Sequence, residues 1–182
     1  MSGLDAKGTY YPNGVNVPAD KLFIASVPVT ATAAELNRAA DTSARIVNTT
    51  AALALTEALH DGKIVTVNSA AGKALTLPAA TGSGTKFHII IGTTVTSVGT
   101  TIKVTGDDIM TGTALVAQDS ADTAVLFETA ATSDTITLNG TTTGGIKGDS
   151  IELIDIAANT WWVRIVASAT GTEATPFSAS VT

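Results

Sequence analysis

Cysteine is absent from this 182-residue chain, and its absence removes three kinds of chemistry at once. Without cysteine there are no disulfides, no thiolate metal ligands and no cysteine nucleophile. Histidine is almost absent too, because only His60 and His88 occur and neither has the spacing of a zinc motif. The sequence therefore predicts a protein without a metal centre or any other cofactor.

Charged residues are also scarce, and positive charge is the scarcer kind. They make up 14% of the chain and leave a net charge of −6, whereas an average soluble domain is about a quarter charged. Because Lys and Arg form no cluster, the chain lacks what binding to a nucleic-acid backbone requires. Apolar runs such as residues 89–91 are far shorter than the ~18 residues of a membrane span. We expect neither a nucleic-acid partner nor a membrane partner.

So little charge is typical of a protein that covers part of its surface with other subunits. Residues 87–91 and 124–127 are apolar at every or nearly every position, so that both faces of a strand would be apolar. Such a strand lies either at the buried centre of a sheet or in a contact between subunits. We expect a homo-oligomer, specifically a trimer.

Catalytic motifs are missing as well. The serines have no Gly-x-Ser-x-Gly elbow, and the Gly-Ser-Gly at residues 82–84 lacks the lysine of a phosphate-binding loop. Glu128 and Glu152 are the conceivable acid pair of a glycoside hydrolase, which needs two carboxylates flanking one bond. Asp119 and Asp122 are conceivable calcium ligands, although acids in solvated turns explain them more simply. The expectation is that the chain is not an enzyme.

Threonine, alanine and glycine dominate what is present. β-branched threonine favours strands, and the 16 glycines supply turns. From residue 46 onward, short apolar clusters recur with turn sequences between them, which leaves no room for crossover helices. The prediction for residues 46–182 is an all-β domain, either a β-sandwich or a barrel. Its expected strands are 51–56, 64–67, 74–77, 87–91, 102–104, 114–117, 125–127, 135–138, 151–156 and 161–166.

Residues 1–45 are predicted to form an extended N-terminal arm that ends in one short helix. Proline and glycine interrupt residues 1–30 so often that neither a helix nor a long strand fits. Apolar side chains stand between these interruptions, whereas a disordered tail would be depleted in them. We expect the arm to dock on another subunit, with folding over its own domain as the alternative. The expected contact residues are Tyr10, Tyr11, Leu22, Phe23 and Ile24.

The short helix is predicted from a capping box at residues 32–35. The hydroxyl of Thr32 can accept from the amide of Glu35, and the carboxylate of Glu35 can accept from the amide of Thr32. Leu36 follows on the narrow apolar face of a helix that is too short to persist alone. Leu36 is therefore a further candidate contact residue.

The pair Trp161-Trp162 predicts a strand with two different faces. Neighbouring residues of a strand point in opposite directions, so Trp161 shares one face with Val163 and Ile165 while Trp162 shares the other with Arg164. In one interpretation Trp161 fills the core and Arg164 stacks on Trp162 over the sheet. In the other, Trp162 and Arg164 anchor a contact with a partner, because Trp and Arg are enriched at the centres of interfaces.

Two stretches of the chain share a weak similarity. Residues 75–91 and 136–154 each contain a triplet with central threonine, a glycine-containing loop and an apolar strand. Chance is one explanation in a chain of this composition. A duplicated hairpin within one sandwich is the other.

Several segments resemble known proteins. Residues 29–37 (VTATAAELN) resemble the TAAELN segment common in structural proteins of tailed bacteriophages, including fibres and head-associated proteins. Residues 75–84 (LTLPAATGSG), 134–145 (DTITLNGTTTGG) and 175–177 (TPF) look like a family of small phage or prophage virion proteins. The resemblance extends over nearly the whole chain. It implies a virion component and carries no catalytic residues.

The length of the chain and its arm favour the head over the tail. Fibres and tailspikes generally have long repeated shafts, whereas proteins that stud a capsid are small and often trimeric, with a terminal arm. We therefore expect a capsid decoration protein that binds the major capsid protein through its arm and one sheet face. It would lie on the capsid exterior of the virion and be made in the host cytoplasm, since the N-terminus lacks a signal-peptide pattern. The alternative is a tail or head fibre component that binds a host-surface glycan.

Overall fold

The computed structural model describes residues 3–4, 10–11, 23–24, 26–32, 35–36, 45–118 and 123–179. The contacts within the chain divide it into two compact units, Met1–Ser43 and Ala44–Thr182. This division falls two residues before the boundary expected from the sequence.

The first unit contains only short elements among its described residues. They are four two-residue strands, paired antiparallel as β1 with β2 and β3 with β4, and a helical segment at residues 35–36. Their bounds are β1 (Gly3–Leu4), β2 (Tyr10–Tyr11), β3 (Phe23–Ile24) and β4 (Val27–Pro28). Such short strands agree with the frequent proline and glycine, which prevent a longer ladder.

The second unit is built almost entirely from strands, and each of the ten expected segments overlaps one of them. The elements are β5 (Ile46–Thr49), β6 (Leu53–Ala54), α2 (Glu57–His60), β7 (Ile64–Val67), β8 (Ala74–Thr76), β9 (Lys86–Ile91), β10 (Thr100–Lys103), β11 (Ile109–Gln118), β12 (Ala124–Glu128), β13 (Thr135–Leu138), β14 (Ser150–Ala157), β15 (Thr160–Ala169) and β16 (Phe177–Ser178).

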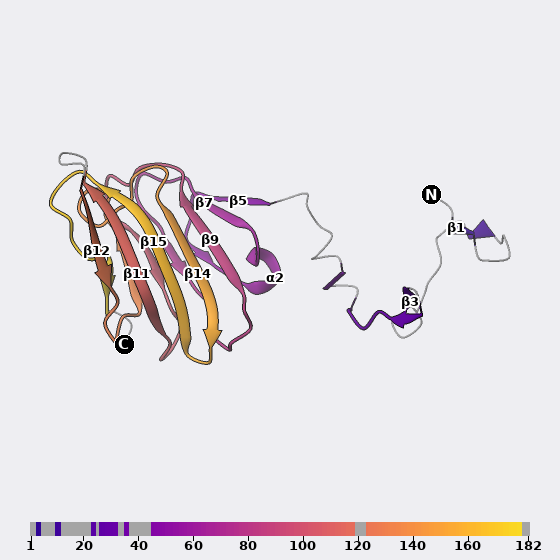
Figure 1. Cartoon of the computed structure of the whole chain (residues 1–182). Helices are drawn as coiled ribbons and strands as arrows, with labels where there is room; N and C mark the ends of the chain where they lie inside the picture. Colours follow the sequence, from indigo (N-terminus) through magenta and orange to yellow (C-terminus); the bar gives the residue numbers. More distant parts are fainter. Residues whose placement is uncertain are drawn as a thin grey trace. The chain divides into compact units, whose positions relative to one another are not determined.

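These strands form two sheets that pack face to face, which confirms the expected all-β sandwich (Figure 1). The larger sheet has seven strands in the order β12-β11-β15-β14-β9-β7-β5. The smaller has five, in the order β16-β13-β10-β8-β6. Each sheet thus has two edge strands, and β12 and β5 are those of the larger sheet.

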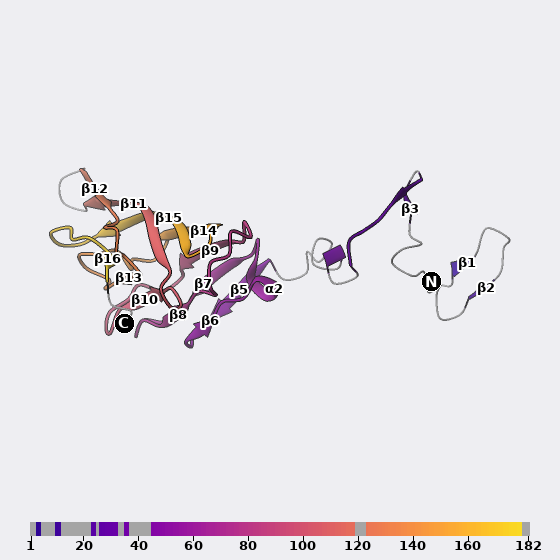
Figure 2. The same cartoon turned by 90° about the horizontal axis from the view of Figure 1, so that it is seen from below.

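The first half of the sandwich has a parallel arrangement that the sequence did not predict. From β5 to β10 the chain alternates between the two sheets, so that β5, β7 and β9 lie side by side in one sheet and β6, β8 and β10 in the other (Figure 2). Neighbours within each set are parallel. Three successive two-strand coils therefore stack on one another, as in a solenoid.

The same alternation explains the two similar stretches of sequence. β8 and β13 belong to the five-stranded sheet, whereas the strands that follow them, β9 and β14, belong to the seven-stranded sheet and pair with each other. Each stretch therefore crosses from one sheet to the other. The interpretation of these stretches as a duplicated hairpin is wrong, because the two strands of a hairpin would pair within one sheet.

β15 joins the two parts of the larger sheet. It pairs parallel with β11 along ten residues on one side and antiparallel with β14 on the other. The hairpin between β14 and β15 turns at Asn159, which has a positive φ of 59°. Without β15, β11 and β12 would have no pairing with the rest of their sheet.

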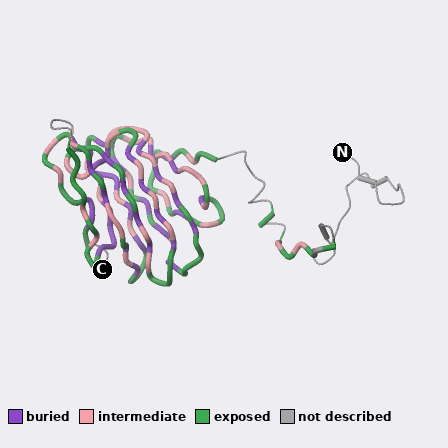
Figure 3. The backbone as a smooth tube through the Cα atoms, in the orientation of Figure 1, coloured by how far each residue is buried: buried purple, intermediate pink, exposed green. Residues whose placement is uncertain are grey.

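The core lies between the two sheets and follows the alternation of the strands (Figure 3). On β15, Trp161, Val163 and Ile165 are buried while Trp162 is half-buried and Arg164 is exposed, as the sequence predicted. The Trp161 ring stacks on that of Phe87 with centroids 5.5 Å apart and planes inclined by 25°. Buried positions of the core lie between Leu55 and Phe177, all within the second unit.

A buried carboxylate, Asp155, holds the loop that crosses from β8 to β9. It accepts hydrogen bonds from the amides of Thr81 (2.9 Å), Gly82 (2.7 Å) and Ser83 (3.1 Å), and from the hydroxyls of Thr81 and Ser83. The positive φ of Gly82, 80°, lets the three consecutive amides converge on one side chain. Burial raises the pKa of Asp155, but the hydrogen bonds outweigh it and lower the pKa to about 2.

A second carboxylate, Asp149, holds the loop that crosses from β13 to β14. It accepts from the amides of Gly145 (2.7 Å), Ile146 (3.0 Å) and Ser168 (3.0 Å). Here burial has the larger effect and raises the pKa of Asp149, although the three amides act to lower it. Each similar stretch of sequence thus crosses between sheets over a buried aspartate.

The helix α2 is a single turn that the sequence pattern did not predict. Glu57 lies in its first turn, and the ring of His60 accepts a hydrogen bond from the amide of Thr56 (3.0 Å). A four-residue helix is shorter than the span over which apolar periodicity can be recognised.

Candidate functional site

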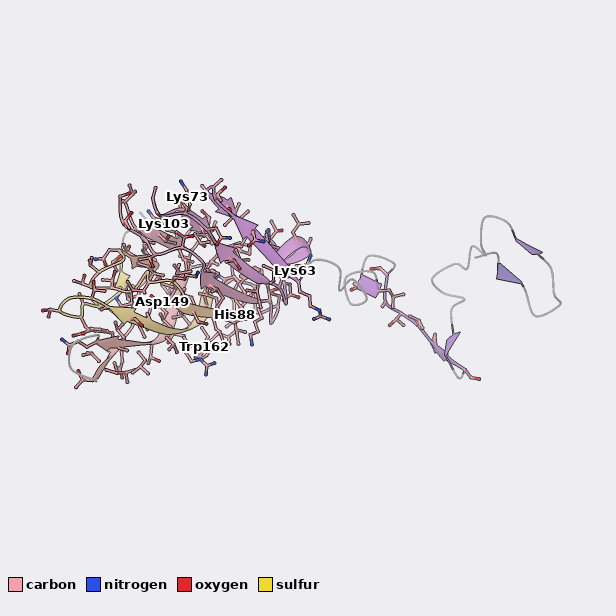
Figure 4. All side chains as sticks on the ribbon, turned by 90° about the horizontal axis from the view of Figure 1, so that it is seen from above. Lys63, Lys73, His88, Lys103, Asp149 and Trp162 are labelled. Atoms are coloured by element: carbon pink, nitrogen blue, oxygen red, sulfur yellow. The ribbon has the colours of Figure 1, made fainter. Side chains whose placement is uncertain are left out.

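The outer face of the seven-stranded sheet carries the predicted contact pair Trp162 and Arg164. Both residues alternate with the buried residues of β15 and so belong to its outer face. Figure 4 shows Trp162 on the side of the sandwich opposite to Lys103 of the smaller sheet. The guanidinium carbon of Arg164 lies 6.0 Å from the centre of the Trp162 ring, as expected for a stacked cation. This geometry agrees with the interpretation in which the pair covers a sheet face, and it leaves the partner contact untested.

Ion pairs run across the strands beside this stack. Arg164 binds Glu152 at 2.6 Å, and the ammonium of Lys86 lies 3.9 Å from the same carboxylate. The side chains of Lys86 and Arg164 are 50% and 57% exposed. Because water screens such exposed charges, each ion pair contributes only about 0–1 kcal/mol to folding. These two ion pairs therefore hold the side chains of Lys86, Glu152 and Arg164 in place on the face and add little to the stability of the fold.

A row of apolar side chains on the same face is open to solvent. Leu126, Leu115 and Val166 are direct register partners on β12, β11 and β15, and their exposed fractions are 60%, 42% and 53%. We call these three residues the apolar row. The row is not evident from the sequence because Leu115 and Val166, which are 51 positions apart, become neighbours only through the parallel pairing of β11 with β15. The sequence does indicate that each of these residues points outward, because the residues next to it on its strand point into the core.

The two strands that look apolar on both faces have different positions. β9 lies inside the sheet, where Phe87, Ile89 and Ile91 are fully buried and the alternate residues are exposed or half-buried. β12 is an edge strand, and Val125 and Leu126 are exposed. A central strand therefore explains β9, while β12 leaves the contact between subunits as an open interpretation.

The two glutamates of the conceivable hydrolase pair lie on strands that are not neighbours. Glu128 and Glu152 lie in one lateral row of a single sheet, with Thr113 and Arg164 between them. Three strand spacings place their backbones roughly 14 Å apart. Glycoside hydrolases leave the space between their two carboxyl groups to the substrate, whereas here Arg164 lies between the glutamates and pairs with Glu152.

One contact of the face brings together residues distant in sequence. Nε2 of His88 lies 2.9 Å from Oγ of Ser150. Glu152, which is opposite His88 in the sheet register, binds Arg164 and Lys86 instead. The arrangement thus lacks the carboxylate that orients the histidine of a catalytic triad.

A shallow depression opens at one end of the same face. Its volume is about 190 Å³, and it is lined by Gly62, Lys63, Ile64, Lys86 and His88. Pockets for drug-sized ligands usually measure roughly 300–1,000 Å³. This depression is therefore smaller than the pockets that usually hold drug-sized ligands.

The described ranges contain neither a cluster of metal ligands nor a membrane-spanning helix. There, no group of three His, Asp or Glu residues could hold a metal ion, and no helix is long and apolar enough to span a membrane. Asp119 and Asp122, the conceivable calcium ligands, lie outside the described residues.

The capping box of the first unit is confirmed. The amide of Thr32 donates to the Glu35 carboxylate (2.6 Å), and the amide of Glu35 donates to the Thr32 hydroxyl (3.2 Å). Leu36 follows, helical and 40% exposed. It is therefore available for the contact predicted for it.

The other predicted contact residues of the arm are placed in part. Tyr10 and Tyr11 form β2, and Phe23 and Ile24 form β3, whereas Leu22 lies outside the described residues. Their docking remains a prediction.

No family model, curated protein or solved structure matches this chain.

Proposed function

We propose that this chain is a structural protein of a tailed-bacteriophage virion, a capsid decoration protein that binds the exterior of the major capsid shell and acts without catalysis or a cofactor. The observation that carries the proposal is the apolar row on the outer face of the larger sheet. Exposed apolar side chains in a contiguous group mark interaction surfaces. The arm, a separate compact unit before the sandwich, adds a second attachment.

The two surfaces have different roles in this proposal. Burial of the apolar row would drive binding at ~25 cal/mol per Å² of apolar surface, and Trp162 with Arg164 would form its polar border. The extended arm would pair with backbone groups of a neighbouring capsid subunit and so fix the orientation. Three copies would assemble around one site of the shell.

A charge in the apolar row should weaken attachment without unfolding the domain. We expect Val166→Lys to lower affinity for expanded empty capsids of the encoding phage tenfold or more, because a lysine would have to be desolvated in the contact. Co-sedimentation with capsids measures binding, and thermal melting reports folding.

The control is Thr101→Lys, which places the same charge on the outer side of the smaller sheet. Thr101→Lys should bind like the parent chain. Equal binding by both variants would contradict a role for the apolar row. Binding of the parent chain to host cells and not to capsids would favour the fibre alternative.

A further inference from the structure

Within the part of the chain that the structure describes, β12 is an unprotected edge of the larger sheet. Edge strands in natural proteins are usually short or carry lysine, proline or a bulge, because their free backbone groups would otherwise pair with another strand. β12 (AVLFE) has five residues, with no lysine or proline, and its register with β11 is uninterrupted. The other sandwich edges, β5, β6 and β16, have four, two and two residues.

The hydrogen-bond pattern shows which backbone groups of β12 face outward. Thr129, just after the strand, donates its amide to Gly112 of β11 (3.1 Å), and Thr123, just before it, accepts from the amide of Gln118 (2.9 Å). Along a strand of an antiparallel pair, every second residue forms backbone hydrogen bonds with the neighbouring strand, and the residues between them direct their amides and carbonyls to the other side. Val125 and Phe127 therefore bond to β11, and the amides and carbonyls of Ala124, Leu126 and Glu128 face the open edge.

This spacing suits pairing with an identical strand that runs in the opposite direction. If two copies of β12 pair about Leu126, each Leu126 exchanges two hydrogen bonds with its mate, and Ala124 does so with Glu128 of the other copy. The single charge, Glu128, then lies opposite an alanine at each end. Parallel in-register pairing would instead place the two Glu128 carboxylates side by side.

We propose that β12 is a contact surface between two copies of this chain, paired antiparallel about Leu126, which joins two seven-stranded sheets into one continuous sheet. The two apolar rows then meet at the two-fold axis and form one strip twice as long. An isologous contact of this kind closes on two copies, so it is distinct from any threefold contact. A five-residue edge buries less than the roughly 1,200 Å² of a stable interface, so the pairing is weak and depends on concentration.

Single-cysteine variants test the pairing directly, because the parent chain has no cysteine. In Leu126→Cys the two thiols belong to directly opposed residues whose Cα atoms are about 5.5 Å apart, within the range of a disulfide. Leu115→Cys is the matched control, exposed on the same face one strand further from the edge. Its mate would lie roughly 14 Å away. Both full-length proteins are oxidised with copper phenanthroline and separated on a non-reducing denaturing gel.

We expect Leu126→Cys to convert mostly to a covalent dimer at least tenfold faster than Leu115→Cys, whose rate measures random collision. Equal rates, or a Leu126→Cys protein that stays monomeric, would overturn the proposal. In the parent protein, the Leu126 amide should exchange with deuterium more slowly as concentration rises. Exchange at the same rate across a hundredfold range of concentration would overturn it too.

Discussion

Replacing Asp155 with asparagine will destabilise the sandwich by about 3–5 kcal/mol, because one amide oxygen cannot accept what the carboxylate accepts. The carboxylate receives three backbone amides and two hydroxyls in a site that is 1% exposed. The –NH₂ group of asparagine would face at least one of these donors and leave it unsatisfied. Urea unfolding followed by far-UV circular dichroism measures the loss.

Asp107→Asn provides the control. Asp107 is exposed in a turn, so its replacement should change the free energy of unfolding by no more than about 0.5 kcal/mol. A loss below about 1 kcal/mol for Asp155→Asn would show that the loop from β8 to β9 does not depend on this carboxylate.

Acid should remove part of the contribution of Asp155. A carboxyl whose pKa is lowered on folding stabilises the protein fully above its unfolded pKa of 3.8, and this contribution disappears as pH falls toward about 2. The difference in stability between the parent chain and Asp155→Asn should therefore narrow by about 2 kcal/mol between pH 5 and pH 2. Asp149 has a raised pKa and acts in the opposite direction, but it is present in both proteins and cancels. A constant difference across this range would contradict the assignment.

Removal of residues 1–43 should separate folding from binding. We expect the remaining domain to melt within a few degrees of the full chain, because every buried core residue in the part of the chain that the structure describes lies between Leu55 and Phe177. Its affinity for capsids should fall about a hundredfold. Each large apolar side chain buried on a partner contributes roughly 1.5–3 kcal/mol, and ordering the arm offsets a good part of this.

Two outcomes would contradict the docking role of the arm. Unfolding of the truncated chain would show that the arm completes the core of its own domain. If the truncated chain folds and still co-sediments with capsids like the full chain, the arm is not needed for attachment and the sheet face alone provides it. Full-length Val166→Lys, measured in parallel, distinguishes loss of the arm from loss of the apolar row.

The sequence predicted the strands well because their signal is local. Alternation on β15 assigns Trp161 to the core and Trp162 to the outside, and the threonine and glutamate of the capping box lie only three residues apart. The parallel coils of β5 to β10 were not predicted, because consecutive strands in them lie in different sheets. Spacing along the chain reveals how many strands there are but not which of them are neighbours.

The candidate site was predicted only where one strand defines it. Trp162 and Arg164 are two residues apart on β15, so parity alone places them on one face. The apolar row requires the register of β11 with both β12 and β15, and the contact of His88 with Ser150 spans 62 residues. Such groupings depend on sheet order, which no local pattern encodes.

The position of β15 has a consequence for synthesis on the ribosome. Before residues 160–169 emerge, the larger sheet exists as two separate pieces. One piece contains β11 and β12, and the other contains β14, β9, β7 and β5. The strands β11 and β14 each expose an unpaired edge at this stage. The last long strand must then enter between them, forming a parallel pair with β11 that closes a large loop of chain. Folding of the sandwich is therefore expected to finish late and slowly, with the nascent chain open to strand exchange between neighbouring ribosomes until β15 is in place.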